Sequence, residues 1–529
     1  MTDQTDLTST ILPFLDRHLG LPLLSHLATT NLFSEQDIAK AQYELAKHTS
    51  MVDYAMQLHQ QAYPETELPQ DLEQQREKAI ALNEQLGKEV DTVLNVIEDP
   101  NVASALKQDK AQNLAWLEEN YNLTEEQINT LYRYGYFHFS CGNYGEASSY
   151  LYHFRVLSTD PALTLSSHWG KLASDILTGE WDRALEEVKL LREHIDTSAA
   201  HMSSNYNRAA SDADGGQEGL LTKRTWLMHW SLFVFFNHPE GREQLVEMFL
   251  SPAYLNTVQS TCWWLLRYLV AALVITRRSS RVYAVAMPST PSNPSPSVTK
   301  LTPQAAMRDV VKIIAAEKYR LKPDPIVDFL QTLYNDFDFE AAQEQLRLAE
   351  QVASNDFFLQ DAKDEFVEAS RYVVSEAYCR IHQRVDIADL SKRLNMSKEE
   401  GEKWIVNLVR DTRADAKIDF KENMVHMNQT HPAVYQTVIE KTRGFTFRTS
   451  AMGQAIDRKA HLPQQNSNAG ADVGAGKEGS GGRGGRGGRG GRGGRGGNRG
   501  DRGDRSQHQQ ATQAQDASSV PKTEAIEAN

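Results

Sequence analysis

Helical spacing of apolar residues is the feature that most constrains how this chain can fold. Ile11, Leu15, Leu19 and Leu23 share one stripe, although Pro13 interrupts it, and residues 72–99 form one long amphipathic pattern. Alternation typical of strands is almost absent from the first 410 residues. The spacing therefore predicts a mainly α fold.

A weak internal repeat indicates how these helices are arranged. "CGNYGEASSYL" (141–151) and "TGEWDRALEEV" (178–188) both read Gly, polar, aromatic, two residues, Ala, and "NDFDFEAAQEQL" (335–346) repeats part of this pattern. The small alanine would let two helices approach closely at a turn. Repetition on this scale is typical of stacked helix pairs, so we expect a tetratricopeptide-like helical repeat solenoid.

Residues 386–411 predict a helix-turn-helix. Ile387, Leu390 and Leu394 form one buried stripe, and Ser397 with Glu400 matches the S-x-x-E capping box at the start of a second helix. We expect the second helix to bury four residues on one face: Trp404, Ile405, Leu408 and Val409.

A hairpin follows this pair of helices. Ile418 and Phe420 alternate with polar residues, as do Val425 and Met427, and residues 422–423 would form the turn. Two helices and a hairpin make a winged helix, whose outer strand would offer backbone groups to a partner. The candidate core and partner surface is therefore Leu390, Leu394, Trp404, Ile405, Leu408, Ile418, Phe420 and Val425.

The charges of the second helix favour protein packing over DNA reading. Residues 397–411 carry three basic and four acidic side chains, and three of the carboxylates lie in the first turn. A recognition helix meets base edges there, and phosphates require cations. We retain direct nucleic-acid reading as the alternative.

Charge and cysteine content limit the class of protein. The formal charge is −14, with +3 in residues 461–529 and therefore −17 in the rest. Three widely spaced cysteines match neither a disulfide framework nor a zinc pattern and suit a reducing compartment.

The sequence shows no targeting or membrane signal. The N-terminus lacks a signal-peptide profile, and the apolar run 262–275 is too short to span a bilayer. We expect a cytoplasmic protein with no membrane partner.

Two internal segments lack a folding pattern. Residues 196–219 are small and polar, which predicts a mobile loop, and residues 287–303 hold five prolines, which predicts a surface excursion between helices.

The C-terminal region is predicted to be a disordered Arg/Gly-rich tail. Glycine removes any bias toward a fold, while arginine offers planar charged groups for phosphates and bases. Messenger or ribosomal RNA is the candidate ligand, and a solubilising or methylated tail is the alternative. The candidate RNA-binding residues are Arg483, Arg486, Arg489, Arg492, Arg495, Arg499, Arg502 and Arg505.

No catalytic arrangement is found in the sequence. "GADVGAGKE" (470–478) departs from a phosphate loop, because Glu478 replaces the Ser or Thr that would hold Mg²⁺. No H-E-x-x-H or C-x-x-C occurs, and His229 and His238 suit packed or capping roles. We therefore expect no enzyme activity, no metal and no cofactor.

Helical repeats followed by a winged helix resemble the PCI architecture of the proteasome lid, the signalosome and translation initiation factor 3. Specific blocks resemble the family of E-type subunits of eukaryotic translation initiation factor 3. These blocks are "FLDRHL" (14–19), "MVDYAM" (51–56), "CGNYGEASSYLYHFRVL" (141–157), "WGKLASDIL" (169–177), "RTWLMHWSLFVFFNHPEGR" (224–242), "NDFFL" (355–359), "CRIHQRVDIADLSKRLNMSKEEGEKWIVNLVRDTRADAKID" (379–419) and "VIEKT" (438–442).

The resemblance implies a non-catalytic scaffold subunit in a complex that binds the small ribosomal subunit and supports recruitment of mRNA and initiator methionyl-tRNA. It implies lateral contacts between winged helices, at 385–428 here, and a C-terminal bundle helix at about 433–460. The expected domains are N-terminal repeats (1–235), a PCI domain (236–430, with its winged helix at 381–430), a C-terminal helix (431–460) and the tail (461–529). The alternatives are a lid or signalosome subunit and a stand-alone RNA-binding regulator.

Overall fold

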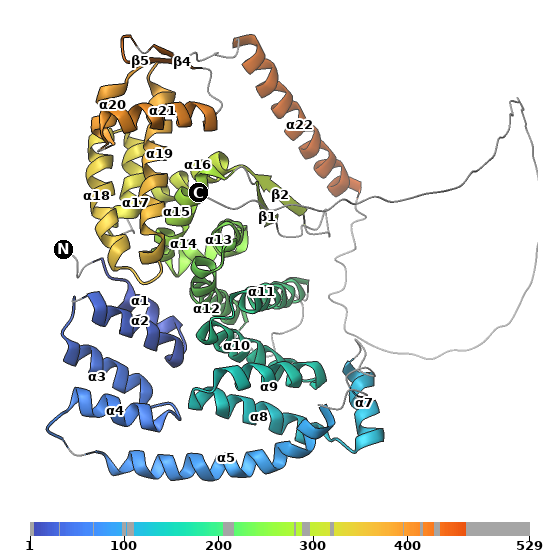
Figure 1. The fold of residues 1–529 in the computed structure, drawn as a ribbon. Coiled ribbons are helices and arrows are strands. Elements are labelled where there is room, and N and C mark those ends of the chain that lie inside the picture. The colour runs from blue at the N-terminus through green and yellow to red at the C-terminus, as the bar shows by residue number, and fades with distance from the viewer. Residues whose placement is uncertain are drawn as a thin grey trace, which may run out of the picture. The chain divides into compact units, whose positions relative to one another are not determined.

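The computed structural model describes most of the chain in two compact units. Met1–His431 and Pro432–Asn529 cluster separately, so each is described by itself. The described residues are 5–30, 32–66, 68–97, 102, 110–204, 216–279, 282–287, 297–317, 322–394, 396–412, 416–419, 421–427 and 434–461. The mainly α fold that the spacing predicted is confirmed (Figure 1).

The first unit begins with short helices followed by a long one. These elements are α1 (Thr8–Ile11), η2 (Leu12–Phe14), α2 (Arg17–Thr30), α3 (Glu35–Ala46), α4 (Val52–Ala62), α5 (Gln70–Ile97) and α7 (Lys110–Tyr121). Pro13 lies in the 3-10 turn η2 and Pro22 inside α2. The predicted stripe is therefore split between elements, although Ile11, Leu19 and Leu23 are all buried.

Five helices then stack in sequence order. They are α8 (Glu125–Cys141), α9 (Tyr144–Leu157), α10 (Pro161–Thr178), α11 (Trp181–Ser204) and α12 (Gly216–Asn237). Gly142 and Gly179 end α8 and α10 at φ 90° and 78°, a region that glycine adopts without a Cβ penalty. Ala147 and Ala184 are fully buried. The repeated Gly and Ala thus mark two equivalent turns, while the tetratricopeptide-like assignment stays a prediction.

The N-terminal helices pack back against the later ones. The Trp230 indole N–H donates to the Phe14 carbonyl at 3.0 Å, and the Ser50 amide donates to the Ser140 carbonyl at 3.1 Å. α5 extends from α4 to α8 and contacts both helices (Figure 1). Residues far apart in sequence therefore share one core.

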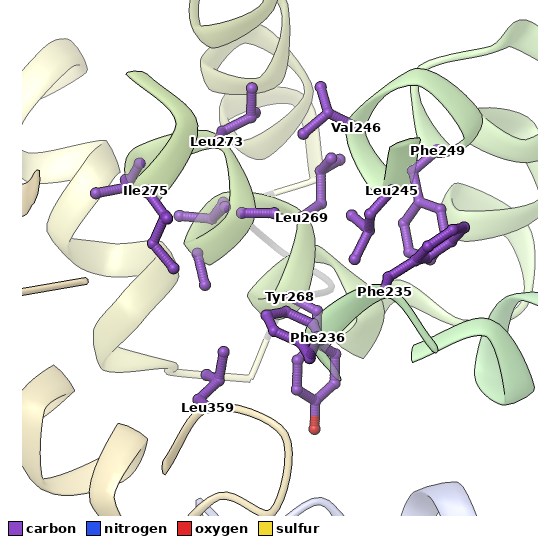
Figure 2. Close-up of a cluster of buried hydrophobic side chains, with 14 of the residues drawn as sticks. Phe235, Phe236, Leu245, Val246, Phe249, Tyr268, Leu269, Leu273, Ile275 and Leu359 are labelled. Carbon is purple, nitrogen blue, oxygen red and sulfur yellow. The ribbon is translucent and has the colours of Figure 1, made fainter. Parts of the chain in front are cut away.

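A second group of helices leads to the C-terminal module of this unit. Its elements are α13 (Gly241–Phe249), α14 (Pro252–Ser260), η4 (Trp263–Leu265), α15 (Leu266–Ile275), η5 (Thr276–Arg278), α16 (Pro303–Glu317), α17 (Pro325–Gln331), η6 (Thr332–Asp336), α18 (Phe339–Asn355), η7 (Gln360–Ala362) and α19 (Lys363–Ile381). Every residue of α15 is buried. Figure 2 shows Leu269 and Leu273 of α15 among side chains of α12 and α13.

Arg267 of α15 is a buried charge that connects distant segments. Its guanidinium donates to Asp324 at 2.6 Å, to Asp356 at 3.1 Å and to the Thr5 carbonyl at 2.7 Å. Burial would lower the pKa of Arg267, but the two carboxylates raise it above its ordinary value. The guanidinium therefore stays charged and holds three segments of chain together.

No single helix among the described residues is long and apolar enough to cross a membrane. The pair Pro252–Ser260 and Trp263–Arg278 meets the length and composition criteria only when both helices are counted, and it is bent by 118°.

The prediction of a mobile loop at 196–219 is wrong at both ends. α11 continues to Ser204, and α12 begins at Gly216, while 205–215 lie outside the described residues. Asp196 accepts a hydrogen bond from Arg224 at 3.0 Å, which joins α11 to α12. Tertiary packing of the two helices therefore outweighs the polar local composition.

The segment 287–303 is also more structured than predicted. β1 (Tyr283–Met287) pairs antiparallel with β2 (Ser297–Leu301), and α16 begins at Pro303. Tyr283 and Val285 are buried, and the Ala284 amide donates to Glu247 of α13 at 2.8 Å. A hairpin packed on α13 replaces the expected excursion, while 288–296 lie outside the described residues.

Candidate protein-interaction surfaces

The end of the first unit folds as a winged helix. Its elements are β3 (Arg384–Asp386), α20 (Ile387–Arg393), α21 (Lys398–Thr412), β4 (Ala416–Asp419) and β5 (Met424–Met427). The strands form one antiparallel sheet in the order β3-β5-β4. The predicted hairpin is β4 and β5, and Asn423 in its turn has a positive φ of 52°.

Local capping explains where the two helices begin. Asp386 accepts a hydrogen bond from the Ala388 amide at 2.8 Å, which caps α20. At α21 the Glu400 amide donates to Ser397 Oγ at 3.4 Å, and the Ser397 amide donates to the Glu400 carboxylate at 3.1 Å. The Ser397 hydroxyl also donates to the Glu400 carboxylate at 2.8 Å, and this bond, followed by that of the Ser397 amide, lowers the pKa of Glu400. The predicted capping box is present.

The predicted winged-helix residues divide by burial. Leu390, Leu394, Ile405, Leu408 and Val425 are buried. Trp404 and Ile418 are half-buried and pack against the same core, and Phe420 lies outside the described residues. These side chains fix the shape of the module, whereas their contribution to a partner surface stays a prediction.

Trp404 docks the module on the helix before it, and Gly401 lets the two helices of the module approach closely. The Trp404 indole N–H donates to Ser375 Oγ of α19 at 3.1 Å. A Cβ on Gly401 would lie 1.9 Å from Ser391 Oγ, so α20 and α21 touch where residue 401 has no side chain. Neither contact could be predicted from the spacing of residues in the sequence.

The sheet has two outer strands. Because β5 lies in the middle, β3 and β4 each have one edge without a strand partner in the described part of the chain. Such an edge presents backbone N–H and C=O groups that another strand can pair with. The outer face of α21 exposes Glu399, Lys403 and Arg410, a mixed set of charges.

The second unit contains the exposed helix α22 (Val434–His461). Residues 435, 438, 442, 445, 449, 452 and 456 follow heptad spacing of three and four. Thr442 and Thr449 are polar, and the other five side chains on this stripe are apolar and more than half exposed: Tyr435 82%, Val438 54%, Phe445 63%, Met452 64% and Ile456 61%. An apolar stripe at this spacing is the pattern of a helix that packs against another helix.

The described residues offer little chemistry beyond binding. No cluster of three or more metal-ligating side chains occurs among them. Burial raises the pKa of Cys262 to about 12 and that of Cys379 to about 11, so both thiols stay protonated at neutral pH. Nothing in the described part of the chain indicates catalysis.

The arginine-rich tail lies outside the described residues, together with all eight candidate RNA-binding arginines. The prediction that this tail binds RNA therefore rests on composition alone.

The winged helix and the helices before it define a class of protein. The profile described as "PCI domain" matches residues 334–429, and the profile described as "eIF3 subunit 6 N terminal domain" matches residues 6–138. The chain is a helical PCI-domain protein.

Relatives narrow this class to one family. The chain is 71% identical over 478 residues to the E-type subunit of eukaryotic translation initiation factor 3 from Mycosarcoma maydis, covering 88% of each protein. It is 45% identical to the E-type subunit of Aspergillus clavatus, with 85% of this chain and 93% of that protein covered. The E-type subunit of Aspergillus fumigatus is 43% identical, with 86% and 94% covered. The chain belongs to the family of E-type subunits of eukaryotic translation initiation factor 3, and is thus a subunit of that factor.

Proposed function

We propose that the chain is a non-catalytic scaffold of eukaryotic translation initiation factor 3 that helps the complex bind the small ribosomal subunit. In this role it supports recruitment of mRNA and initiator methionyl-tRNA in the cytoplasm. Membership of the family supports this assembly, and we infer that α22 and the strand edges of the winged helix would supply its contacts.

The exposed stripe of α22 is the observation that carries this proposal. Five apolar side chains on one face of a helix are costly in water, at roughly 1.5–3 kcal/mol each relative to burial. The stripe repeats over the whole helix, so it suits a bundle with helices of sister subunits.

Strand edges supply a second, lateral contact. β3 and β4 each offer one edge, and the winged helix of a sister subunit would extend the sheet through backbone hydrogen bonds. The rigid docking of Trp404 on α19 would keep this edge in a fixed orientation to the helices.

The arginine-glycine tail would add RNA affinity without a role in assembly. Eight arginines contacting single-stranded RNA would give a log–log salt slope of about −6. A stand-alone RNA-binding regulator is the alternative that this tail favours.

Purification of the tagged full-length chain from its native cells at moderate salt tests the assembly. We expect the other subunits of initiation factor 3 and small-subunit ribosomal proteins to copurify, as identified by mass spectrometry. Recovery of RNA-binding proteins alone would favour the stand-alone regulator. Recovery of proteasome-lid or signalosome subunits would contradict the proposal.

Deletion of residues 480–505 separates the tail from the scaffold. We expect subunit recovery to be unchanged, while RNA affinity falls and its salt slope flattens. Loss of the other subunits on this deletion would show that the tail takes part in assembly. Replacement of the eight arginines by lysine is the matched control, because it keeps the charge and removes the planar groups.

A further inference from the structure

An aromatic pocket opens where the N-terminal helices, the stacked helices and the α18–α19 connection meet. Its volume is about 320 Å³. Five aromatic residues line it: Trp181, Phe233, Phe236, Phe357 and Phe358. We call it the aromatic pocket.

Edge-to-face contacts hold the walls of the aromatic pocket in place. The ring centroids of Phe233 and Phe358 are 4.9 Å apart, and those of Phe357 and Phe358 are 5.0 Å apart. His26 of α2 contacts the Phe357 ring at 5.5 Å and lies 2.9 Å from Gln360 Oε1. Trp181 and Phe357 remain partly exposed. The pocket is therefore a formed hollow that opens to solvent.

One acidic side chain lines the aromatic pocket, and another follows Trp181 in the sequence. Asp361 is exposed and lines the pocket, and Asp182 follows Trp181 with 95% of its side chain exposed. Asp182 accepts a hydrogen bond from His238 at 3.0 Å, which leaves carboxylate oxygens in solvent. Apolar walls beside carboxylates favour an apolar anchor with a cationic neighbour.

One segment of this chain is unsuited to fill the pocket, because residues 462–529 contain no Phe, Trp or Tyr.

We propose that the aromatic pocket binds a short segment of another protein through one aromatic side chain with a lysine or arginine close to it in sequence. The anchor ring would contact Trp181 and Phe357, and the cation would pair with Asp361. The volume suits one large side chain and not a folded surface. This interaction is independent of the strand edges and of α22.

Selection of a random displayed peptide library against the full-length chain tests the chemistry. We expect the enriched peptides to share Trp, Phe or Tyr within three positions of Lys or Arg. Their affinity is then measured by fluorescence anisotropy, beside versions in which the aromatic residue is replaced by alanine. Enrichment without an aromatic residue, or equal affinity of the alanine versions, would overturn the proposal.

Matched variants locate the binding site. Asn237 lines the pocket at the end of α12, is exposed, and donates to the Phe233 carbonyl at 2.7 Å. Asn237→Trp fills the opening and should weaken peptide binding at least about tenfold, whereas Asn237→Ala loses the same hydrogen bond and should change it less than about twofold. Equal effects would place the peptides elsewhere.

A second pair of variants tests the role of the carboxylate that lines the pocket. Asp361→Lys reverses the charge beside the pocket and should weaken binding about fivefold, while Asp364→Lys, at an exposed position of α19, should leave it within about twofold. Equal losses for both would show that only the overall acidity of the surface matters.

Photo-crosslinking identifies the natural occupant. A benzoylphenylalanine at position 177, on the pocket wall, is introduced into the full chain in its native complex. A crosslink to an aromatic residue beside Lys or Arg in another protein supports the proposal. Crosslinks to α22, to residues 318–321 or to a second copy of this chain, or no crosslink at all, would overturn it.

Discussion

His229 is a buried histidine whose surroundings favour the neutral ring. It stacks on Phe14 with centroids 4.6 Å apart, and its Nδ1 lies 2.7 Å from the Thr225 carbonyl, a position from which it donates. The Trp264 indole N–H donates to its Nε2 at 3.0 Å. Burial lowers the pKa of His229 to about 4. The residue joins η2, α12 and η4 and has a structural role.

This lowered pKa predicts a loss of stability in mild acid. Below the ordinary pKa of about 6.5 the unfolded chain binds a proton that the folded chain excludes, so the stabilisation is complete above that pH and is lost toward pH 4. Between pH 7 and pH 5, His229 should contribute a loss of about 2 kcal/mol in the free energy of unfolding.

The substitution His229→Gln keeps a side chain that can donate and accept hydrogen bonds, but removes the imidazole that binds a proton in acid. Denaturant unfolding of both proteins at pH 7 and pH 5 should show a smaller loss for the variant. The same pH dependence in both would contradict the buried neutral ring.

Gly401 sets the spacing of the helix-turn-helix. A Cβ there would lie 1.9 Å from Ser391 Oγ and 2.8 Å from Ser391 Cβ. We expect Gly401→Ala to separate α20 from α21 and to destabilise the winged helix by about 1–3 kcal/mol, measured by hydrogen exchange in α20.

Gly444→Ala is the matched control, because nothing lies within 4 Å of that position in α22. Alanine should stabilise this helix by up to about 1 kcal/mol. If Gly401→Ala left the stability of the winged helix unchanged, the two helices would not approach as closely as described.

The stripe of α22 predicts a variant that folds and fails to assemble. Phe445→Glu places a charge on the apolar face, and because the residue is 63% exposed, thermal unfolding of the isolated chain should not change. Recovery of sister subunits in a pull-down should fall at least about tenfold.

Gln454→Glu adds the same charge at an exposed position off the stripe and should leave recovery intact. Equal recovery with both variants would exclude the stripe as an interface.

Elements encoded by neighbouring residues could be predicted from the sequence. The capping box of Ser397 and Glu400, the hairpin at 416–427 and the buried run of α15 all depend on local spacing. The hairpin of β1 and β2 could not be predicted in this way, because Tyr283 and Leu301 pair across eighteen positions and depend on α13 for burial. The heptad stripe of α22 was present in the sequence and was missed.

The connection between the two ends of the first unit could not be predicted at all. No pattern indicates that Thr5 meets Arg267, or that Phe14 meets Trp230, because both contacts depend on how α5 returns the chain to α8. The aromatic pocket depends on the same contacts between distant segments, since its walls come from α2, α10, the start of α11, α12 and the connection between α18 and α19. Periodicity predicts helices but not which distant helices touch.

A substitution at Arg267 tests whether this residue holds distant segments of the first unit together. Arg267→Met leaves Asp324 and Asp356 without their cation, and Asp356 already has a pKa raised by burial. We expect a loss of about 3–5 kcal/mol in the free energy of unfolding.

Arg347→Met breaks the exposed pair with Glu344 and should cost less than about 1 kcal/mol. Equal effects of the two variants on denaturant unfolding would show that Arg267 does not hold the segments together.

The uncovered face of α22 has a consequence for the cell as well as for the complex. A chain made in excess of its partners keeps this apolar face in water, where chaperones and proteases recognise such surfaces. Its lifetime would then follow the supply of the sister subunits and not its own rate of synthesis. The same side chains that join the assembly would thus adjust the abundance of the protein to the number of complexes that can be built.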